Sequence, residues 1–192
     1  TLISRMIKSK ELRIAVTGAN GFVAKNTRNL LHKKGVMLFG ISRKNFLNNK
    51  YESKIISPDF NINYISSKLK NCDALIHLIG IGRQSIKSTF ESVNVELTKK
   101  VLQLCKKTKI KKLVYISGLG VSNNTVSSYF ISKYKAENEI ITSGLDYTIL
   151  RASYIIGKND PLTKNLNGQI KSGKIIIPGS GKYHLQPIFV ND

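Results

Sequence analysis

The chain has 192 residues, 41% of them hydrophobic, and a formal net charge of +20. This length and apolar content can bury a sizeable core, which excludes a disordered chain and fits one domain, or one domain and part of a second. The two cysteines, Cys72 and Cys105, lie in unrelated segments without the spacing of metal ligands. The sequence therefore predicts neither a disulfide framework nor a metal site.

The opening segment, residues 1–13, is basic and too polar for a secretory signal peptide. We expect a short disordered lead there, with an organelle transit peptide as the alternative. No apolar run approaches the roughly 18 residues of a membrane-spanning helix. Together with the cysteine content, this favours a cytoplasmic location, and an organelle matrix is the alternative.

Lysine supplies most of the positive charge, and its densest run lies at residues 106–112, where a helix is expected to end. Lysines at that end complement the helix dipole and keep the surface hydrated. A specific nucleic-acid reader should also have clustered arginines, an aromatic stacking platform or a recognisable module, and the sequence has none of these. We interpret the charge as a solvated surface; the alternative, nucleic-acid binding through charge alone, should vanish with added salt.

Apolar runs alternate with helical patterns along the chain. In chain order we predict a strand at 12–18, a helix at 22–35, strands at 36–43 and 72–80, a helix at 90–107, a strand at 112–118, a helix at 127–144, and a strand with its exit at 145–157. The asparagine-rich stretch between the second and third strands is ambiguous. Apolar strands separated by helices predict a parallel sheet covered on both faces, so the fold class is α/β, a doubly wound Rossmann-like sheet.

The stretch TGANGFVA, residues 17–24, follows the first predicted strand and opens the first predicted helix. Gly18, Gly21 and Ala24 have the spacing of a dinucleotide-binding turn, in which backbone N–H groups and the helix dipole face a pyrophosphate. Alanine in the third place is a mild departure, because only close packing of helix on strand is needed there. A tight turn without a ligand is the alternative.

The second predicted strand ends in Ser42, Arg43 and Lys44, and the next acidic residue is Glu52. An acidic side chain at this place usually holds a free ribose 2′-hydroxyl, whereas arginine can grip a 2′-phosphate with two hydrogen bonds. The sequence therefore favours NADP(H) over NAD(H), with Arg43 and Ser42 as contacts. The alternative is that Arg43 is an ordinary surface residue.

Tyr129 and Lys133, followed by Ala136 and Glu137, resemble the tyrosine-x-x-x-lysine helix of the extended short-chain dehydrogenase/reductase superfamily, the nucleotide-sugar epimerase and dehydratase group. Other segments resemble the motifs of this group in the same order: TGANGF at 17–22, the strand with Asp73 and His77, NVELTKKVL at 94–102, YTILRASYIIGKND at 147–160 and QPIFVND at 186–192. Within the superfamily, the segments YISGLGVS at 115–122 and PGSGKYHLQPIFVND at 178–192 resemble atypical members related to the nucleotide-binding accessory subunit of respiratory complex I.

The resemblance implies an acid–base pair, and the chemistry agrees. Tyr129 and Lys133 share one helix face, and an ammonium close to a phenol favours phenolate, so we expect a lowered pKa for Tyr129. Tyr129 can then exchange a proton with a carbinol, while Lys133 also holds the nicotinamide ribose. A core aromatic residue beside a surface lysine is the alternative. The residues predicted to contact the cofactor are Gly18, Ala19, Asn20, Gly21, Phe22, Val23, Ser42, Arg43, Leu78, Ile79, Gly80, Tyr129 and Lys133.

Members of the superfamily that this sequence resembles usually have a serine or threonine after the fifth strand, commonly the third residue of a triplet, which binds the reacting oxygen. Here the triplet is Ser117, Gly118 and Leu119, and leucine cannot donate a hydrogen bond. Ser117 is the candidate, with Ser122 as a fallback on the following loop. Ala152 and Lys158 replace two prolines of the group. These departures leave cofactor binding intact and weaken the case for catalysis.

We divide the chain into a dinucleotide-binding domain, residues 1–151, and part of a substrate-binding lobe, residues 152–192. The resembling group continues beyond the final motif, so we expect a truncated chain or a fragment. Short strands punctuated by Gly and Pro are predicted at 170–187, without a catalytic role. Members of the group often dimerise, here through the helices near 90–107 and 129–143.

Two hypotheses from different classes remain open. The preferred one is an NAD(P)(H)-dependent oxidoreductase or epimerase/dehydratase acting on a carbonyl, carbinol or nucleotide-sugar substrate, with Tyr129, Lys133 and Ser117 as catalytic residues. The alternative is a non-catalytic, nucleotide-bound structural or sensor subunit of a larger assembly. Leu119 favours the second hypothesis, whereas the tyrosine and lysine favour the first.

Overall fold

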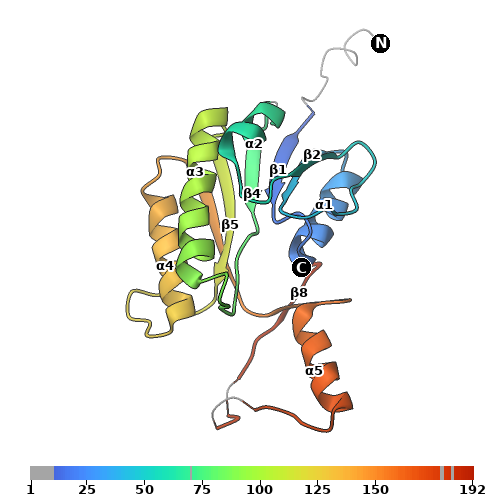
Figure 1. Cartoon of the computed structure of the whole chain (residues 1–192), viewed down its shortest axis with the longest axis vertical. Coiled ribbons are helices and arrows are strands. Elements are labelled where there is room, and N and C mark those ends of the chain that lie inside the picture. The colour runs from blue at the N-terminus through green and yellow to red at the C-terminus, as the bar shows by residue number, and fades with distance from the viewer. Residues whose placement is uncertain (1–10, 70, 178–179, 183) are drawn as a thin grey trace, which may run out of the picture.

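The computed structural model describes residues 11–69, 71–177, 180–182 and 184–192; most of the opening segment and part of the final motif lie outside these ranges. Its main sheet has six parallel strands with helices on both faces (Figure 1). In spatial order the strands are β3 (Ser53–Ile56), β2 (Met37–Ser42), β1 (Arg13–Thr17), β4 (Ala74–His77), β5 (Lys112–Gly118) and β6 (Asp146–Ala152). The helices are α1 (Phe22–Lys33), α2 (Ile62–Lys68), the π-helical segment η2 (Glu91–Glu96), α3 (Leu97–Thr108), α4 (Ser128–Ile141) and α5 (Pro161–Lys171). The predicted fold class is confirmed.

The strand order reverses beside β1, where the chain returns from β3 to build β4 on the other side. At the carboxyl end of β1, Thr17 pairs with Ile41 of β2 and with His77 of β4. In doubly wound sheets, ligands bind in the crevice beyond the carboxyl ends of the strands at such a reversal. The topology therefore predicts a site beside these three residues.

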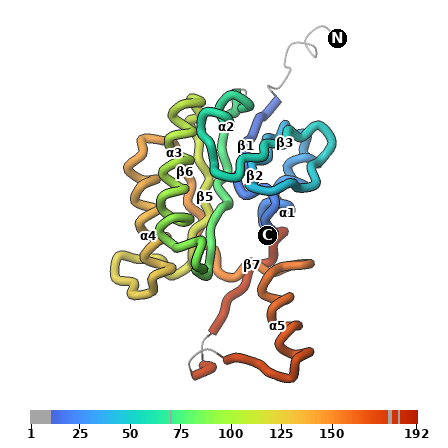
Figure 2. Tube along the Cα trace, viewed as in Figure 1, coloured from blue at the N-terminus to red at the C-terminus, as the bar shows by residue number. Residues whose placement is uncertain are grey.

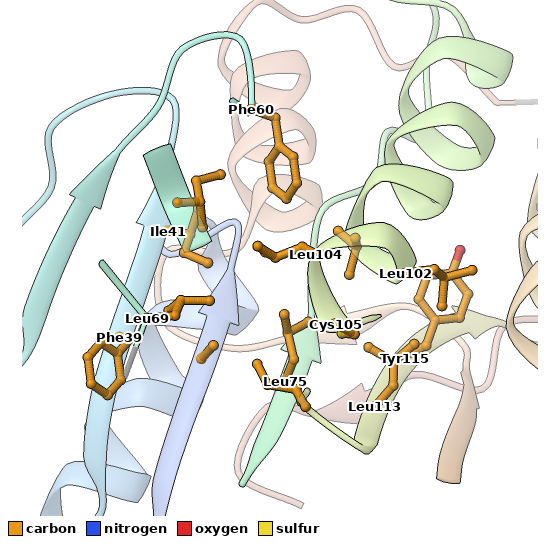
Figure 3. Close-up of a cluster of buried hydrophobic side chains, with 14 of the residues drawn as sticks. Phe39, Ile41, Phe60, Leu69, Leu75, Leu102, Leu104, Cys105, Leu113 and Tyr115 are labelled. Carbon is orange, nitrogen blue, oxygen red and sulfur yellow. The ribbon is translucent and has the colours of Figure 1, made fainter. Parts of the chain in front are cut away.

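Successive residues of β1 point to opposite faces of the sheet. Ala15 belongs to the larger apolar cluster, which lies under α2, α3 and α4 and includes Leu75 and Leu104 (Figure 3). Ile14 and Val16 belong to a smaller cluster under α1. Because each helix runs antiparallel to the strand before it, this packing brings the first turns of the helices to the carboxyl edge of the sheet.

The asparagine-rich stretch that the sequence left ambiguous contains β3 and α2. β3 is short, and two of its four side chains are exposed, so its apolar pattern is weak. α2 starts at Asn61, whose side chain accepts a hydrogen bond from the Tyr64 N–H at 3.0 Å. The predicted helix at 90–107 is present, but it begins as the π-helical segment η2.

The last part of the chain differs from the prediction. The segment predicted as a strand and its exit, 145–157, contains β6 and then β7 (Ile155–Ile156), which pairs in parallel with β8 (Ile188–Phe189). No strand lies within the described residues of 170–187, so the prediction of strands there is wrong. Instead, α5 precedes this stretch, because Asp160 caps the Thr163 N–H and Pro161 suits a first helical turn.

α5, β7 and β8 lie beyond the carboxyl edge of the main sheet (Figure 2). A Cβ atom at Gly157 would lie 2.7 Å from Val190 Cγ1 and 3.2 Å from the ring of Phe22. The segment around β7 and β8 therefore packs against the start of α1. Within the described ranges, no helix combines the length and apolar character needed to cross a membrane.

Candidate functional site

A cleft runs along the carboxyl ends of the central strands and consists of two adjoining hollows. The first hollow has a volume of about 440 Å³ and the second about 410 Å³. Gly21 and the loop after β4, residues 78–81, line both hollows, so the two meet there. The cleft therefore occupies the place where the strand order reverses.

The glycine turn between β1 and α1 packs closely against the loop after β4. Gly18 has a φ of +70°, and a Cβ atom there would lie 3.1 Å from both the Ile79 side chain and the Leu78 carbonyl oxygen, so a larger residue would displace the loop after β4. The Gly21 N–H donates to the Gly18 carbonyl at 2.7 Å, and α1 follows without an acidic side chain in its first turn. A helix start that lines the cleft and has no acidic side chain in its first turn fits a pyrophosphate.

The second hollow is the charged part of the cleft. Its lining includes the cations Arg43, Lys44 and Lys87 and the carboxylate Asp59. Ser42 also lines it, and its hydroxyl accepts a hydrogen bond from the Lys44 N–H at 3.3 Å. The structure thus brings the predicted contacts Ser42 and Arg43 together, and adds two lysines and a carboxylate that the sequence analysis missed.

Ala19 differs from the other predicted cofactor contacts, because it lines neither hollow. It is fully buried; its N–H donates to the Ile41 carbonyl at 3.0 Å, and its own carbonyl accepts a hydrogen bond from Arg28 at 2.5 Å. Its place in the turn is therefore structural. The predicted contacts that do line the cleft are Gly18, Asn20, Gly21, Phe22, Val23, Ser42, Arg43, Leu78, Ile79, Gly80, Tyr129 and Lys133.

A buried ion pair of Arg28 and Glu52 joins α1 to the segment after β2, and the sequence analysis did not identify it. Arg28 donates to both carboxylate oxygens of Glu52 and to the Leu47 carbonyl, and its guanidinium lies 4.6 Å from the centre of the Phe46 ring. The only signal in the sequence is that Arg28 follows Ala24 by four residues, so both share the inward face of α1. The pair connects α1 to the segment that follows β2.

Lys133 reaches the first hollow from α4 and is held by two neutral acceptors. Its Nζ donates to the Tyr115 hydroxyl and to the Ile116 carbonyl, both at 2.8 Å. Burial lowers the pKa of Lys133 from its ordinary value of 10.5 to about 8, and Glu137 opposes this shift. A Cβ atom at Gly80 would lie 3.6 Å from Nζ, so the glycine leaves the ammonium accessible from the loop after β4.

Tyr129 and Ser117 line the same hollow as Lys133. The Ser117 Oγ is buried without a hydrogen-bond partner among the described residues, which leaves it available to a ligand oxygen. The expected lowering of the Tyr129 pKa is wrong for this structure: burial raises that pKa, and Tyr154 raises it further. The ammonium of Lys133 bonds to Tyr115 instead, so it does not offset the burial of Tyr129.

The structure, like the sequence, gives Leu119 no role as a hydrogen-bond donor to the reacting oxygen. This side chain is 52% exposed and lines a third hollow beyond Tyr129, where it offers no hydrogen bond. Ser122, the fallback donor, is exposed and lines none of the three hollows. Ser117 is therefore the serine of the triplet region that the structure places beside Tyr129.

A buried polar chain joins β1, β4 and α3 behind the cleft. The Thr98 hydroxyl donates to the Asn94 carbonyl at 2.7 Å, so it accepts a hydrogen bond from His77 Nε2 at 3.2 Å. His77 Nδ1 then accepts from the Thr17 hydroxyl at 2.7 Å. Burial, aided by the charge of Lys133, lowers the pKa of His77 to about 3. His77 is therefore a neutral structural residue.

Asn94, in the π-helical segment, positions the loop that both hollows share. Its side-chain oxygen accepts a hydrogen bond from the Ile81 N–H at 2.9 Å, and its Nδ2 donates to the Ile81 carbonyl at 3.2 Å and to the Ser132 hydroxyl at 2.9 Å. The sequence analysis identified this asparagine only as part of a motif. π-Helical turns are frequent at functional sites, and here the turn connects the loop after β4 to α4.

Comparisons with known proteins agree with this geometry. Residues 18–174 match a family model described as NAD(P)H-binding. The Saccharomyces cerevisiae UPF0659 protein YMR090W is 26% identical over 156 residues, which cover 73% of this chain and 68% of that protein. NADH dehydrogenase [ubiquinone] 1 alpha subcomplex subunit 9 of Arabidopsis thaliana is 25% identical over 130 residues, covering 67% of this chain and 32% of that subunit. The chain thus spans about a third of the subunit's length.

Solved structures with the same fold include the UDP-glucose 4-epimerase of Thermotoga maritima, determined with UDP-glucose. Its TM-score is 0.77 at 19% sequence identity, and the match covers 94% of this chain and 70% of that chain. The likeness shows that the two proteins share a fold. Because the family model matches most of the chain, this protein belongs to the NAD(P)H-binding family.

Proposed function

We propose that this chain binds NADP(H) in the cleft and acts as an oxidoreductase or epimerase/dehydratase on a carbonyl, carbinol or nucleotide-sugar substrate. The observation that carries the proposal is the first hollow, where Tyr129 and Lys133 lie with the Ser117 hydroxyl, which has no hydrogen-bond partner among the described residues. The NAD(P)H-binding family and the nucleotide-sugar epimerases among the structural neighbours support it.

Different residues of the cleft bind different parts of the cofactor. The glycine turn and the start of α1 receive the pyrophosphate, and Arg43 and Ser42 receive the 2′-phosphate of the adenosine ribose. Lys133, whose Nζ lies 3.6 Å from the place of a Cβ atom at Gly80, holds the nicotinamide ribose. When bound, the nicotinamide supplies or accepts a hydride.

The side chains of the first hollow orient the substrate oxygen and exchange a proton with it. Ser117 donates a hydrogen bond to the substrate oxygen and orients it, because its hydroxyl has no other partner among the described residues. Tyr129 exchanges a proton with that oxygen. Lys133, held by neutral acceptors, places a positive charge in the same hollow as this exchange.

A titration with NADPH and with NADH at moderate salt tests the cofactor part of the proposal. We expect NADPH to bind more tightly, and Arg43→Glu to weaken NADPH binding by about tenfold or more while NADH binding changes little. Lys106→Glu, the same charge reversal at an exposed position of α3, is the matched control. Equal affinities for the two nucleotides that Arg43→Glu leaves unchanged would contradict the preference.

A second candidate, a nucleotide-bound structural or sensor subunit, is favoured by Leu119 and by the raised pKa of Tyr129. Tyr129→Phe separates the two. For an enzyme, this variant loses turnover by about a hundredfold or more while it keeps nucleotide affinity and thermal stability. For the second candidate, NADPH raises the melting temperature of both proteins equally, and neither converts a substrate.

A further inference from the structure

The third hollow lies on the far side of Tyr129 and has a volume of about 370 Å³. It opens from the first hollow, because both are lined by Gly82, Tyr129, Ala152, Ser153 and Tyr154. Its own lining adds Gly118, Leu119 and Phe130. A ligand in this hollow would therefore lie directly against the proposed acid–base residue.

Aromatic rings form one wall of the third hollow. The rings of Tyr129 and Phe130 lie 5.2 Å apart with an angle of 60° between their planes, and Phe90 supports Tyr129 from another side at 5.8 Å and 66°. A Cβ atom at Gly118 would lie 3.1 Å from the Phe130 ring and 3.5 Å from the Tyr129 ring. The glycine therefore lets the backbone of β5 lie close against the aromatic wall.

The charged side chains of the cleft decrease in number from one end to the other. The second hollow is lined by Arg43, Lys44, Lys87 and Asp59, and the first by Lys133. The lining of the third hollow, as far as the chain is described, has no charged side chain. The diphosphate of a nucleotide sugar needs charged partners or several hydrogen-bond donors, because an unpaired anion against apolar walls is strongly disfavoured. The third hollow does not offer charged partners among its described lining residues.

We infer that the third hollow binds a flat, uncharged carbonyl compound, aromatic or conjugated, with its oxygen directed to Tyr129. A flat ring stacks against the aromatic wall and contacts Leu119 with its edge. Among the residues that line this hollow, Tyr129, Ser153 and Tyr154 carry hydroxyls. This inference rests on the proposed function and narrows its substrate to one class; nucleotide sugars are thereby excluded from this hollow.

Ligand binding tests the inference without the cofactor. Acetophenone is the flat, uncharged probe, cyclohexyl methyl ketone is a probe of similar size that is not flat, and UDP-glucose is the charged comparison. In saturation-transfer NMR titrations, we expect acetophenone to bind several-fold more tightly than cyclohexyl methyl ketone. We also expect that UDP-glucose does not displace acetophenone.

The matched variants use two leucines of equal exposure. Leu119 and Leu30 are both 52% exposed, but Leu30 lies on α1 and lines none of the three hollows. Leu119→Asp places a carboxylate against the ligand and should weaken acetophenone binding by about tenfold, whereas Leu30→Asp should leave it unchanged. Circular dichroism of both variants checks that each is folded.

Several outcomes would overturn the inference. Displacement of acetophenone by UDP-glucose, equal binding of the two ketones, or equal affinity in Leu119→Asp and Leu30→Asp would each do so. NADPH titration distinguishes this failure from that of the proposed function. If NADPH binds and acetophenone does not, only the substrate class falls; if acetophenone binds and NADPH does not, the proposed function falls.

Discussion

Two cations are buried near the cleft, and they have opposite surroundings. Arg28 is 2% exposed and meets Glu52 through both carboxylate oxygens. Lys133 is 5% exposed and donates to a phenol and a backbone carbonyl, which are neutral. Glu137, one turn further along α4, accepts hydrogen bonds from Arg151 at both of its carboxylate oxygens.

The difference separates a structural charge from a reactive one. A buried ion pair with its hydrogen bonds satisfied keeps both groups ionised and fixed in place. A buried ammonium with neutral partners keeps its charge only at a desolvation cost, and the pKa of Lys133 falls to about 8 as a result. Perturbed groups of this kind cluster at functional sites, and Lys133, unlike Arg28, lines the cleft.

The largest effect is expected from removing the counter-charge of Arg28. Glu52→Gln keeps the volume of the side chain but leaves a buried guanidinium unpaired, so the free energy of unfolding should fall by about 3–5 kcal/mol. Urea denaturation at neutral pH, followed by circular dichroism, measures this loss. Because Arg28 also bonds to the carbonyl of Ala19 in the glycine turn, NADPH affinity should fall with it.

An exposed pair provides the matched control. Lys112 and Asp146 lie 3.6 Å apart with side chains 68% and 66% exposed. Asp146→Asn should change the free energy of unfolding by less than about 1 kcal/mol. If Glu52→Gln were as mild as this control, the buried pair would not stabilise the turn.

The second prediction concerns the dependence of stability on pH. The folded pKa of Lys133 lies below its unfolded value of 10.5, so between pH 8 and 10.5 the unfolded chain binds the extra proton and stability rises with pH. The wild-type protein should gain about 1 kcal/mol relative to Lys133→Met between pH 7 and 9. Denaturation of both proteins across this range measures the gain.

The comparison of the two proteins also removes other titrations. Burial raises the pKa of Cys72 to about 11 and that of Cys105 to about 12, so both thiols reduce stability as the pH rises above 9. They do so equally in the wild type and in Lys133→Met. Parallel pH profiles for the two proteins would mean that Lys133 is not desolvated as described.

The framework of this fold was predictable because its signals are local. The apolar runs at β1, β4 and β5 are bounded by turn residues, and the glycine turn after β1 comes directly before a helix. β3 was missed because a strand of four residues with two exposed side chains has little pattern. The strands expected at 170–187 were predicted from Gly and Pro alone, and these residues mark turns without specifying what lies between them.

The site was predictable in its lining and less so in its electrostatics. The spacing of Tyr129 and Lys133 places both at the first hollow, but only the structure brings the Tyr115 hydroxyl within 2.8 Å of the lysine. Such a contact joins residues 18 positions apart, and no local pattern encodes it. The pair of Arg28 and Glu52 was hidden for the same reason.

The smallest effect is expected at Glu137, whose negative charge raises the pKa of Lys133 against the effect of burial. Glu137→Gln removes that charge, so the pKa of Lys133 should fall further below 8 and the pH-dependent gain over Lys133→Met should begin at a lower pH. Two further groups lie close to Lys133, Tyr115 on β5 and His77 on β4. Both are neutral over this pH range, so they do not alter the direction of the expected pKa change. Glu139→Gln, an exposed substitution on the same helix, should leave the onset unchanged. An unchanged onset in Glu137→Gln would mean that Arg151 already neutralises this carboxylate and that burial alone sets the pKa of Lys133. A raised onset would contradict the direction of the Glu137 effect.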